Sequence, residues 1–178
     1  MKITMIRHGK VDMKWKKWYT SKQFDLDCSN YDLAPLIPFD NEIEDNTRAD
    51  IYISALKRSR ETAEQIFERK DFIENKLLNE VPLKSFCNCK FNLPLWIWNI
   101  AGRLQWLMQS KRQIEGKNET EKRADALIEE LRQRNRDCIL ITHGFFMRTM
   151  IKELKQDGFT IDKSKLSFAN LERVIATK

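Results

Sequence analysis

The chain has 178 residues, of which 42% are hydrophobic and 33% are charged, with a formal net charge of +6. These values predict one domain over residues 1–178 with a real core, and the basic charge favours an anionic partner: a phosphorylated metabolite, a nucleic acid or a membrane surface. The most apolar stretch, residues 93–108, contains Pro94 and Arg103 and is too short for a transmembrane helix, which needs about 20 apolar residues.

Predicted strands and helices alternate along the chain. Short apolar runs predict strands, and apolar residues at helical spacing predict helices. In chain order we expect a strand at 2–7, a loop or a loop with a short helix at 10–30, an irregular connection at 31–48, a strand at 50–54, a helix at 58–70, a strand at 77–81, a helix at 94–110, a helix at 119–134, a strand at 136–142, a helix at 145–156 and a strand at 172–176. The alternation predicts an α/β fold, a three-layer α/β/α sandwich with a mostly parallel sheet.

The four cysteines are interpreted as reduced thiols. No secretory signal precedes the first predicted strand, so we expect a cytoplasmic protein. Cys87 and Cys89 could be two soft metal ligands, but no second pair stands at zinc spacing. We therefore expect neither a metal nor another cofactor.

The only two histidines of the chain, His8 and His143, each follow an apolar run and precede a glycine. In α/β proteins ligands bind outside the carboxyl ends of the strands, where such positions lie. Arg7 stands beside His8, and Arg58 follows the second predicted strand. If these two strands are neighbours, Arg7, His8 and Arg58 meet at one sheet edge, and His143 can join them.

This set of side chains is suited to phosphoryl transfer. His8 could attack phosphorus as a neutral imidazole, with its other ring nitrogen held by an acceptor such as a backbone carbonyl. The arginines Arg7 and Arg58, with a protonated His143, would hold the phosphate oxygens. Cationic side chains in that role remove the need for a metal ion.

Three sequence blocks resemble the histidine phosphatase superfamily, also called phosphoglycerate mutase-like. Arg7-His8-Gly9 is similar to its first histidine block and Thr142-His143-Gly144 to its second. Residues 54–63, SALKRSRETA, are similar to the arginine block, with serine in place of its usual alanine. The resemblance selects Arg58 rather than Arg60 for the phosphate pocket, and it implies phosphate contacts from Arg7, Arg58 and Gly144.

The family also uses a carboxylic acid to protonate the leaving oxygen. Leu78-Asn79-Glu80 matches the segment that carries this acid in the mutase branch, so the resemblance implies that Glu80 is catalytic. Positioned proton transfer gives a rate gain of about 10²–10⁴-fold. Glu80 would then act as a base on the water that hydrolyses the phosphohistidine.

Two segments depart from the family. Residues 10–14, KVDMK, lack the asparagine that usually contacts phosphate. Residues 81–84, VPLK, replace the Arg-x-Tyr-Gly stretch that helps a mutase retain its bisphosphate. The second departure and the short chain favour a phosphatase over a mutase.

Each candidate also has a plain structural interpretation. Either histidine could be a core residue, and Glu80 could be a solvated glutamate. The basic and aromatic run 14–19 could be a nucleic-acid patch, but we favour an exposed flap near the pocket, where Lys10, Lys14 or Trp15 would touch substrate.

The tryptophan-rich segment 94–106 carries Trp96, Trp98 and Trp106. We expect a helix that packs on the core and also carries Ile100, Leu104 and Leu107. A lid over the substrate or a dimer surface is the alternative.

The sequence thus predicts a metal-independent phosphomonoester hydrolase that forms a phosphohistidine on His8. Its partner would be a small phosphorylated metabolite, with no nucleic acid, no membrane and a possible homodimer. The alternatives are a bisphosphate-primed phosphoglycerate mutase and a non-catalytic phosphate-binding module.

Overall fold

The computed structural model describes residues 1–40, 48–163, 167 and 169–178. A six-stranded sheet forms its centre, in the order β4-β3-β6-β1-β8-β7. The first four of these run parallel, and β8 is antiparallel to both of its neighbours. The strands are β1 (Lys2–Arg7), β3 (Asp50–Ile53), β4 (Ile73–Glu74), β6 (Cys138–Thr142), β7 (Thr160–Ile161) and β8 (Arg173–Thr177).

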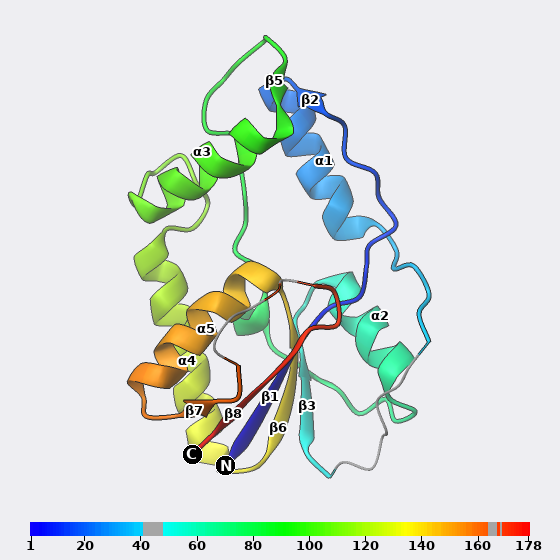
Figure 1. Ribbon diagram of the computed structural model, residues 1–178, viewed down its shortest axis with the longest axis vertical. Coiled ribbons are helices and arrows are strands. Elements are labelled where there is room, and N and C mark those ends of the chain that lie inside the picture. Colours follow the sequence, from blue (N-terminus) through cyan, green and yellow to red (C-terminus); the bar gives the residue numbers. More distant parts are fainter. Residues whose placement is uncertain (41–47, 164–166, 168) are drawn as a thin grey trace.

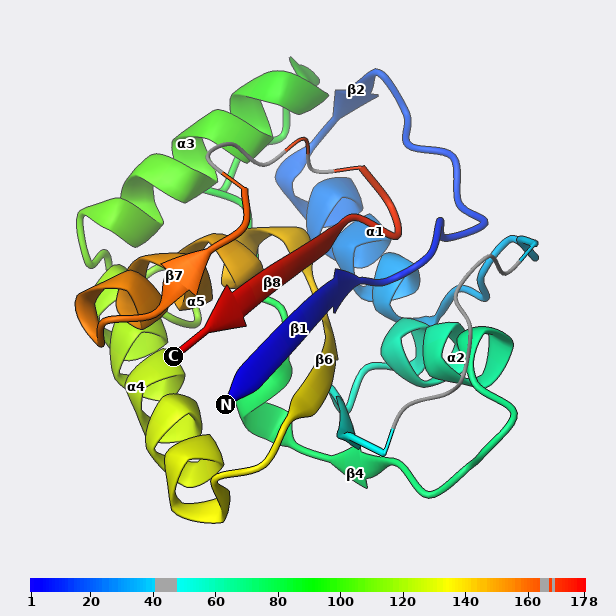
Figure 2. The same ribbon diagram turned by 60° about the horizontal axis from the view of Figure 1, so that its bottom comes forward.

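Helices cover both faces of this sheet (Figures 1 and 2). Helices α4 (Lys117–Arg134) and α5 (Gly144–Gln156) pack on one face, where the core includes Leu140. Helix α2 (Lys57–Ile66) packs on the other, against Ile141. All five residues of β6 are buried because both of its faces are covered, which explains its unbroken apolar sequence. The predicted three-layer, mostly parallel α/β fold is confirmed.

A smaller group of elements, which we call the cap, lies beyond the carboxyl ends of β1 and β6 (Figure 1). It comprises β2 (Trp18–Tyr19), α1 (Ser21–Leu33), β5 (Leu93–Pro94) and α3 (Leu95–Leu107), and β2 pairs with β5. Trp98 is fully buried in its own cluster and stacks on Phe24, with ring centroids 5.6 Å apart. The cap therefore has a core separate from those on the two faces of the sheet.

The predicted packing of α3 on the core is found for only part of its surface. Trp98 is buried and Trp106 is partly buried against the main core, but Trp96, Ile100, Leu104 and Leu107 are exposed. Their spacing marks one side of a helix in either case, and spacing alone does not say whether that side meets the core or solvent.

Helix α1 is longer than the sequence predicts, since we expected a loop or a loop with a short helix at 10–30. It has 13 residues and continues to Leu33, into the connection expected to be irregular. A capping box begins it: the Thr20 hydroxyl accepts from the Gln23 backbone and the Gln23 side chain accepts from the Thr20 backbone. Residues 41–47 of the predicted connection lie outside the described residues.

The strand predicted at 77–81 is absent. A single 3₁₀ turn, η1 (Lys76–Leu78), stands there instead, and the edge strand β4 comes just before it. The Asn75 side chain accepts from the Leu77 backbone and so starts the turn. Helix α2 is shorter than predicted because it ends at Ile66, and the next residue, Phe67, is buried against the sheet.

The first two predicted strands are not neighbours in the sheet. Strand β6 lies between β1 and β3 and pairs in parallel with both. No helix among the described residues is long and apolar enough to cross a membrane.

Candidate active site

The two histidines lie side by side at the carboxyl ends of β1 and β6. Arg7 of β1 pairs with Thr142 of β6, so the next residues, His8 and His143, reach the same level of the sheet. Both rings are buried, and their centroids are 5.0 Å apart. The placement of β6 in the sheet brings His143 into the middle of the site rather than to its side.

His8 is held as a neutral imidazole. Its Nδ1 lies 2.7 Å from the Gly9 carbonyl oxygen, which fixes the proton on Nδ1 and leaves a lone pair on Nε2. Burial, and then the guanidinium of Arg58, lower the pKa of His8 from 6.5 to about 3. The predicted carbonyl acceptor is therefore present, and the unprotonated Nε2 has the form that a nucleophile needs.

The backbone around His8 is fixed by two side chains that sequence reasoning missed. The Asn170 amide donates to the carbonyls of both His8 and Gly9 at 3.1 Å. The Gly9 N–H donates to the Thr62 hydroxyl, which in turn donates to the Arg58 carbonyl. No spacing signal pointed to Asn170, because it lies 162 residues from His8.

His143 has protein partners for both of its ring nitrogens. Arg58 Nε donates to its Nδ1 at 3.2 Å, so the ring proton is on Nε2, 2.7 Å from the Ser54 hydroxyl oxygen. Burial, and then Arg58, lower the pKa of His143 well below its usual value. The sequence argument expects a protonated His143 beside the phosphate oxygens. In the structure His143 is instead neutral, and it orients Arg58.

Arg58 is buried at the start of α2, and its guanidinium joins three parts of the site. Besides its bond to His143, it donates from NH1 to Asp32 at 2.7 Å and lies over the Tyr31 ring, 5.0 Å from its centroid. Arg60 points elsewhere and pairs with Glu74 in an exposed ion pair. The structure thus places Arg58, and not Arg60, beside the two histidines.

Arg7 and Gly144 lie against each other. A Cβ atom built on Gly144 would be 3.1 Å from Arg7 Nε, tighter than most real contacts. Glycine at the first position of α5 therefore leaves the space that the Arg7 side chain occupies.

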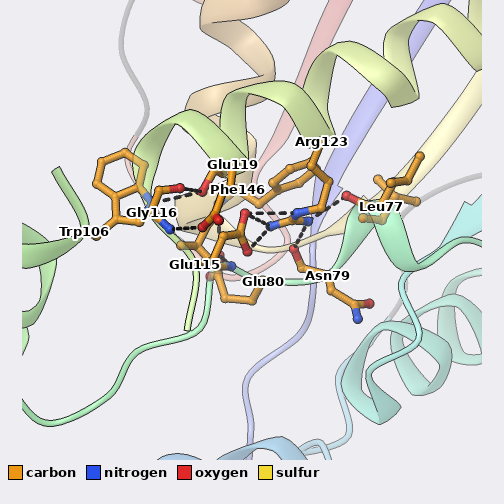
Figure 3. Close-up of polar contacts among 12 residues, drawn as sticks. Leu77, Asn79, Glu80, Trp106, Glu115, Gly116, Glu119, Arg123 and Phe146 are labelled. Atoms are coloured by element: carbon orange, nitrogen blue, oxygen red, sulfur yellow. Dashed lines mark hydrogen bonds and ion pairs between the residues drawn. The ribbon is translucent and has the colours of Figure 1, made fainter. Parts of the chain in front are cut away.

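Glu80 is anchored at the amino terminus of α5, the helix that His143 caps. Its Oε1 accepts from the backbone N–H groups of Val81 and Phe146 at 2.9 Å, and its Oε2 accepts from that of Phe145 at 3.3 Å. Figure 3 shows Glu80 next to Phe146, below α4. These bonds place the Glu80 carboxylate close to the second histidine. Its Oε2 accepts only one long hydrogen bond from the backbone.

Arg123 of α4 fixes the segment that carries Glu80 (Figure 3). Its NH1 donates to the carbonyls of Leu77 and Asn79 at 2.7 Å, and its NH2 pairs with Glu115 at 3.0 Å. These bonds satisfy two loop carbonyls that a strand would have bonded to its neighbour, and they hold the loop over the sheet edge.

A cavity of about 670 Å³ opens between this site and the cap. Arg7, His8, Arg58 and Glu80 line it, and so does Trp15 from the run predicted to touch substrate. Lys10 and Lys14 are not among its lining residues within the described chain. Sequence reasoning missed the helix α1, which contributes Tyr31 and Asp32 to the wall.

No group of three histidine, cysteine, aspartate or glutamate side chains that could hold a metal ion occurs in the described part of the chain. Cys87 and Cys89 are free thiols in the cap.

Several solved structures share the fold of this chain. No curated protein sequence matches the chain. Among solved structures, a mutant phosphoserine phosphatase from Entamoeba histolytica in complex with phosphoserine is 17% identical, with a TM-score of 0.59 over 98% of this chain and 89% of that one. Phosphoglycerate mutase from Bacillus anthracis is 17% identical, with a TM-score of 0.59 over 98% and 87%. A mycobacterial glucosyl-3-phosphoglycerate phosphatase is 16% identical, with a TM-score of 0.55 over 87% and 79%.

These likenesses show the phosphoglycerate mutase-like fold. The family model of the histidine phosphatase superfamily (branch 1) matches residues 3–174, nearly the whole chain. The chain therefore belongs to the histidine phosphatase superfamily, whose members include enzymes of the phosphatase and mutase type.

Proposed function

We propose that this protein is a metal-independent phosphatase that hydrolyses a small phosphorylated metabolite through a phosphohistidine on His8. The observation that carries the proposal is the neutral state of His8: its Nδ1 proton is held by the Gly9 carbonyl, so the lone pair is on Nε2. His8 also lines the cavity, so Nε2 is the ring nitrogen that is left for a substrate.

In the first step, His8 Nε2 attacks phosphorus and the bond from phosphorus to the alcohol oxygen breaks. The electron pair goes to that oxygen, which takes a proton from Glu80. Arg7 and Arg58 stabilise the charge on the phosphate oxygens, and the bond from His143 keeps Arg58 in the required orientation. The product of this step is an alcohol and phospho-His8.

In the second step, a water molecule attacks phosphorus and gives its proton to the Glu80 carboxylate. The bond from phosphorus to Nε2 breaks, its electron pair returns to the imidazole, and inorganic phosphate leaves. Glu80 is protonated again and His8 is neutral again, so the cycle closes without a metal ion.

The departure at residues 81–84 supports a phosphatase rather than a mutase, because these residues line the cavity where a mutase retains its bisphosphate.

The first test is hydrolysis of p-nitrophenyl phosphate by wild type and His8→Ala, with EDTA present, between acidic and neutral pH. We expect wild-type activity to survive EDTA, the variant to be inactive, and the quenched wild-type protein alone to carry phosphate that is labile in acid and stable in base. Activity that appears only with a bisphosphate primer would favour a mutase. No hydrolysis of any phosphomonoester by wild type would favour a phosphate-binding module.

A further inference from the structure

One side of α3 is apolar and faces solvent. Exposed fractions there range from 51% for Leu107 to 77% for Met108. The opposite side of the helix holds Trp98 and Gly102, which are buried in the cap. We call the exposed set the apolar face: Trp96, Ile100, Leu104, Leu107 and Met108.

Two more exposed aromatic residues belong to the small sheet of the cap or lie just before it. Trp18 of β2 pairs with Pro94 of β5 and is 56% exposed. Phe91, just before β5, is 81% exposed. Figure 1 shows β2 and β5 next to each other where α3 begins. Exposed aromatic residues therefore lie in the part of the cap where α3 begins.

The two chain segments that carry these exposed apolar residues are basic. Residues 81–114 contain no aspartate or glutamate, and neither do residues 13–24. The pairing of β2 with β5 brings these two segments together in the cap. Their nine basic residues are Lys14, Lys16, Lys17, Lys22, Lys84, Lys90, Arg103, Lys111 and Arg112.

We propose that the apolar face docks on the surface of an anionic lipid bilayer. A helix with exposed tryptophan and leucine on one side and lysines around it lies in the bilayer interface, with its apolar side buried among the acyl chains. Aromatic rings prefer the headgroup level, and lysines are attracted by anionic headgroups. This association needs no membrane-spanning segment.

Charge distinguishes this partner from a second copy of the chain. A symmetric dimer through the apolar face would bring the same basic segments of both copies together, and their like charges would repel. A nucleic acid would match the charge but would leave the apolar face exposed to water. An anionic bilayer matches both properties, so we replace the expectation of no membrane partner and a possible homodimer with this one.

The test is co-sedimentation of the full chain with vesicles of phosphatidylcholine alone and of phosphatidylcholine mixed with phosphatidylserine. We expect binding only to the mixed vesicles, and weaker binding as salt is raised. Each lysine near an anionic bilayer contributes about fivefold to binding, so the double variant Lys16→Glu/Lys17→Glu should bind at least tenfold more weakly. Trp96→Ser/Leu104→Ser should lose binding to a similar extent.

The matched control is Leu33→Ser, which removes an exposed leucine from α1, outside the apolar face. It should bind as wild type does. Thermal unfolding of each variant shows whether the fold is retained. Absence of binding to mixed vesicles, or equal loss in the control, overturns the proposal. So does a dimer in analytical ultracentrifugation that Trp96→Ser/Leu104→Ser dissociates, because the face would then join two copies.

Discussion

The Asp32 carboxylate lies 2.7 Å from the guanidinium of Arg58, inside the cavity where we propose that the phosphate group binds. Arg58 is almost fully buried, whereas the side chain of Asp32 is 49% exposed. The pair therefore joins a fixed cation to an anion that water can reach. A phosphate dianion that binds Arg58 must share or displace this carboxylate.

Replacing Asp32 with asparagine should strengthen phosphate binding. The variant removes a negative charge near the phosphate site and keeps the size of the side chain. Because a half-exposed ion pair is worth at most about 1 kcal/mol, the inhibition constant of inorganic phosphate should fall by about twofold to fivefold. Inhibition of p-nitrophenyl phosphate hydrolysis measures it. Asp27→Asn, on the same helix but outside the cavity lining, is the control. An unchanged or higher inhibition constant for Asp32→Asn would mean that Asp32 does not compete with phosphate for Arg58.

Arg58 and Arg60 offer a comparison within one helix. Arg58→Ala removes a buried cation that contacts His143, whereas Arg60→Ala removes one partner of an exposed ion pair with Glu74. Loss of one electrostatic stabiliser of a transition state costs about 10²–10³-fold in turnover, so we expect that loss for Arg58→Ala. Arg60→Ala should stay within about twofold of wild type. Steady-state kinetics measure the turnover of both variants. Similar losses of turnover would mean that Arg58 does not stabilise the charge on the phosphate oxygens.

Glu80→Gln tests proton transfer to the leaving group. Glutamine keeps an acceptor oxygen for the α5 backbone but has no proton for the alcohol oxygen. Alkyl phosphates need that proton more than aryl phosphates, so kcat/KM for an alkyl phosphate, which reports the phosphorylation step, should fall by about 10²–10⁴-fold. For p-nitrophenyl phosphate the fall in kcat/KM should be smaller. Equal losses for both substrates would mean that Glu80 is not the acid.

The central part of this site was predictable because it depends on strand ends. A buried strand followed by a histidine marks the carboxyl edge of a parallel sheet, so the positions of His8 and His143 follow from short local patterns. Arg58 follows the second predicted strand, and the resemblance of residues 54–63 to the family's arginine block selected it over Arg60. The order of the strands was not predictable, since the alternation of elements does not say that β6 lies between β1 and β3.

The cap was predicted less well for a physical reason. Its residues come from two distant segments, and contacts such as that between Asp32 and Arg58 depend on how α1 packs rather than on any local spacing. The apolar side of α3 has the periodicity of a buried helix. This periodicity predicts packing on the core, although that side of the helix faces solvent. Asn170 was missed because a loop amide has no periodic signal.

The low pKa values of the two histidines make protein stability depend on pH. Both rings are neutral in the folded protein, with the pKa of His8 at about 3 and that of His143 well below 6.5, whereas in the unfolded chain both titrate near 6.5. Below pH 6.5 the unfolded chain therefore binds more protons, and the free energy of unfolding falls as pH is lowered towards 3. Each histidine contributes a slope of up to about 1.4 kcal/mol per pH unit. Urea unfolding at pH 7, 6 and 5 measures this free energy, and His8→Asn should show about half of the histidine-dependent slope. An identical slope in wild type and variant would mean that folding does not lower the pKa of His8. The imidazole would then be protonated below pH 6.5 and would have no lone pair there for the attack.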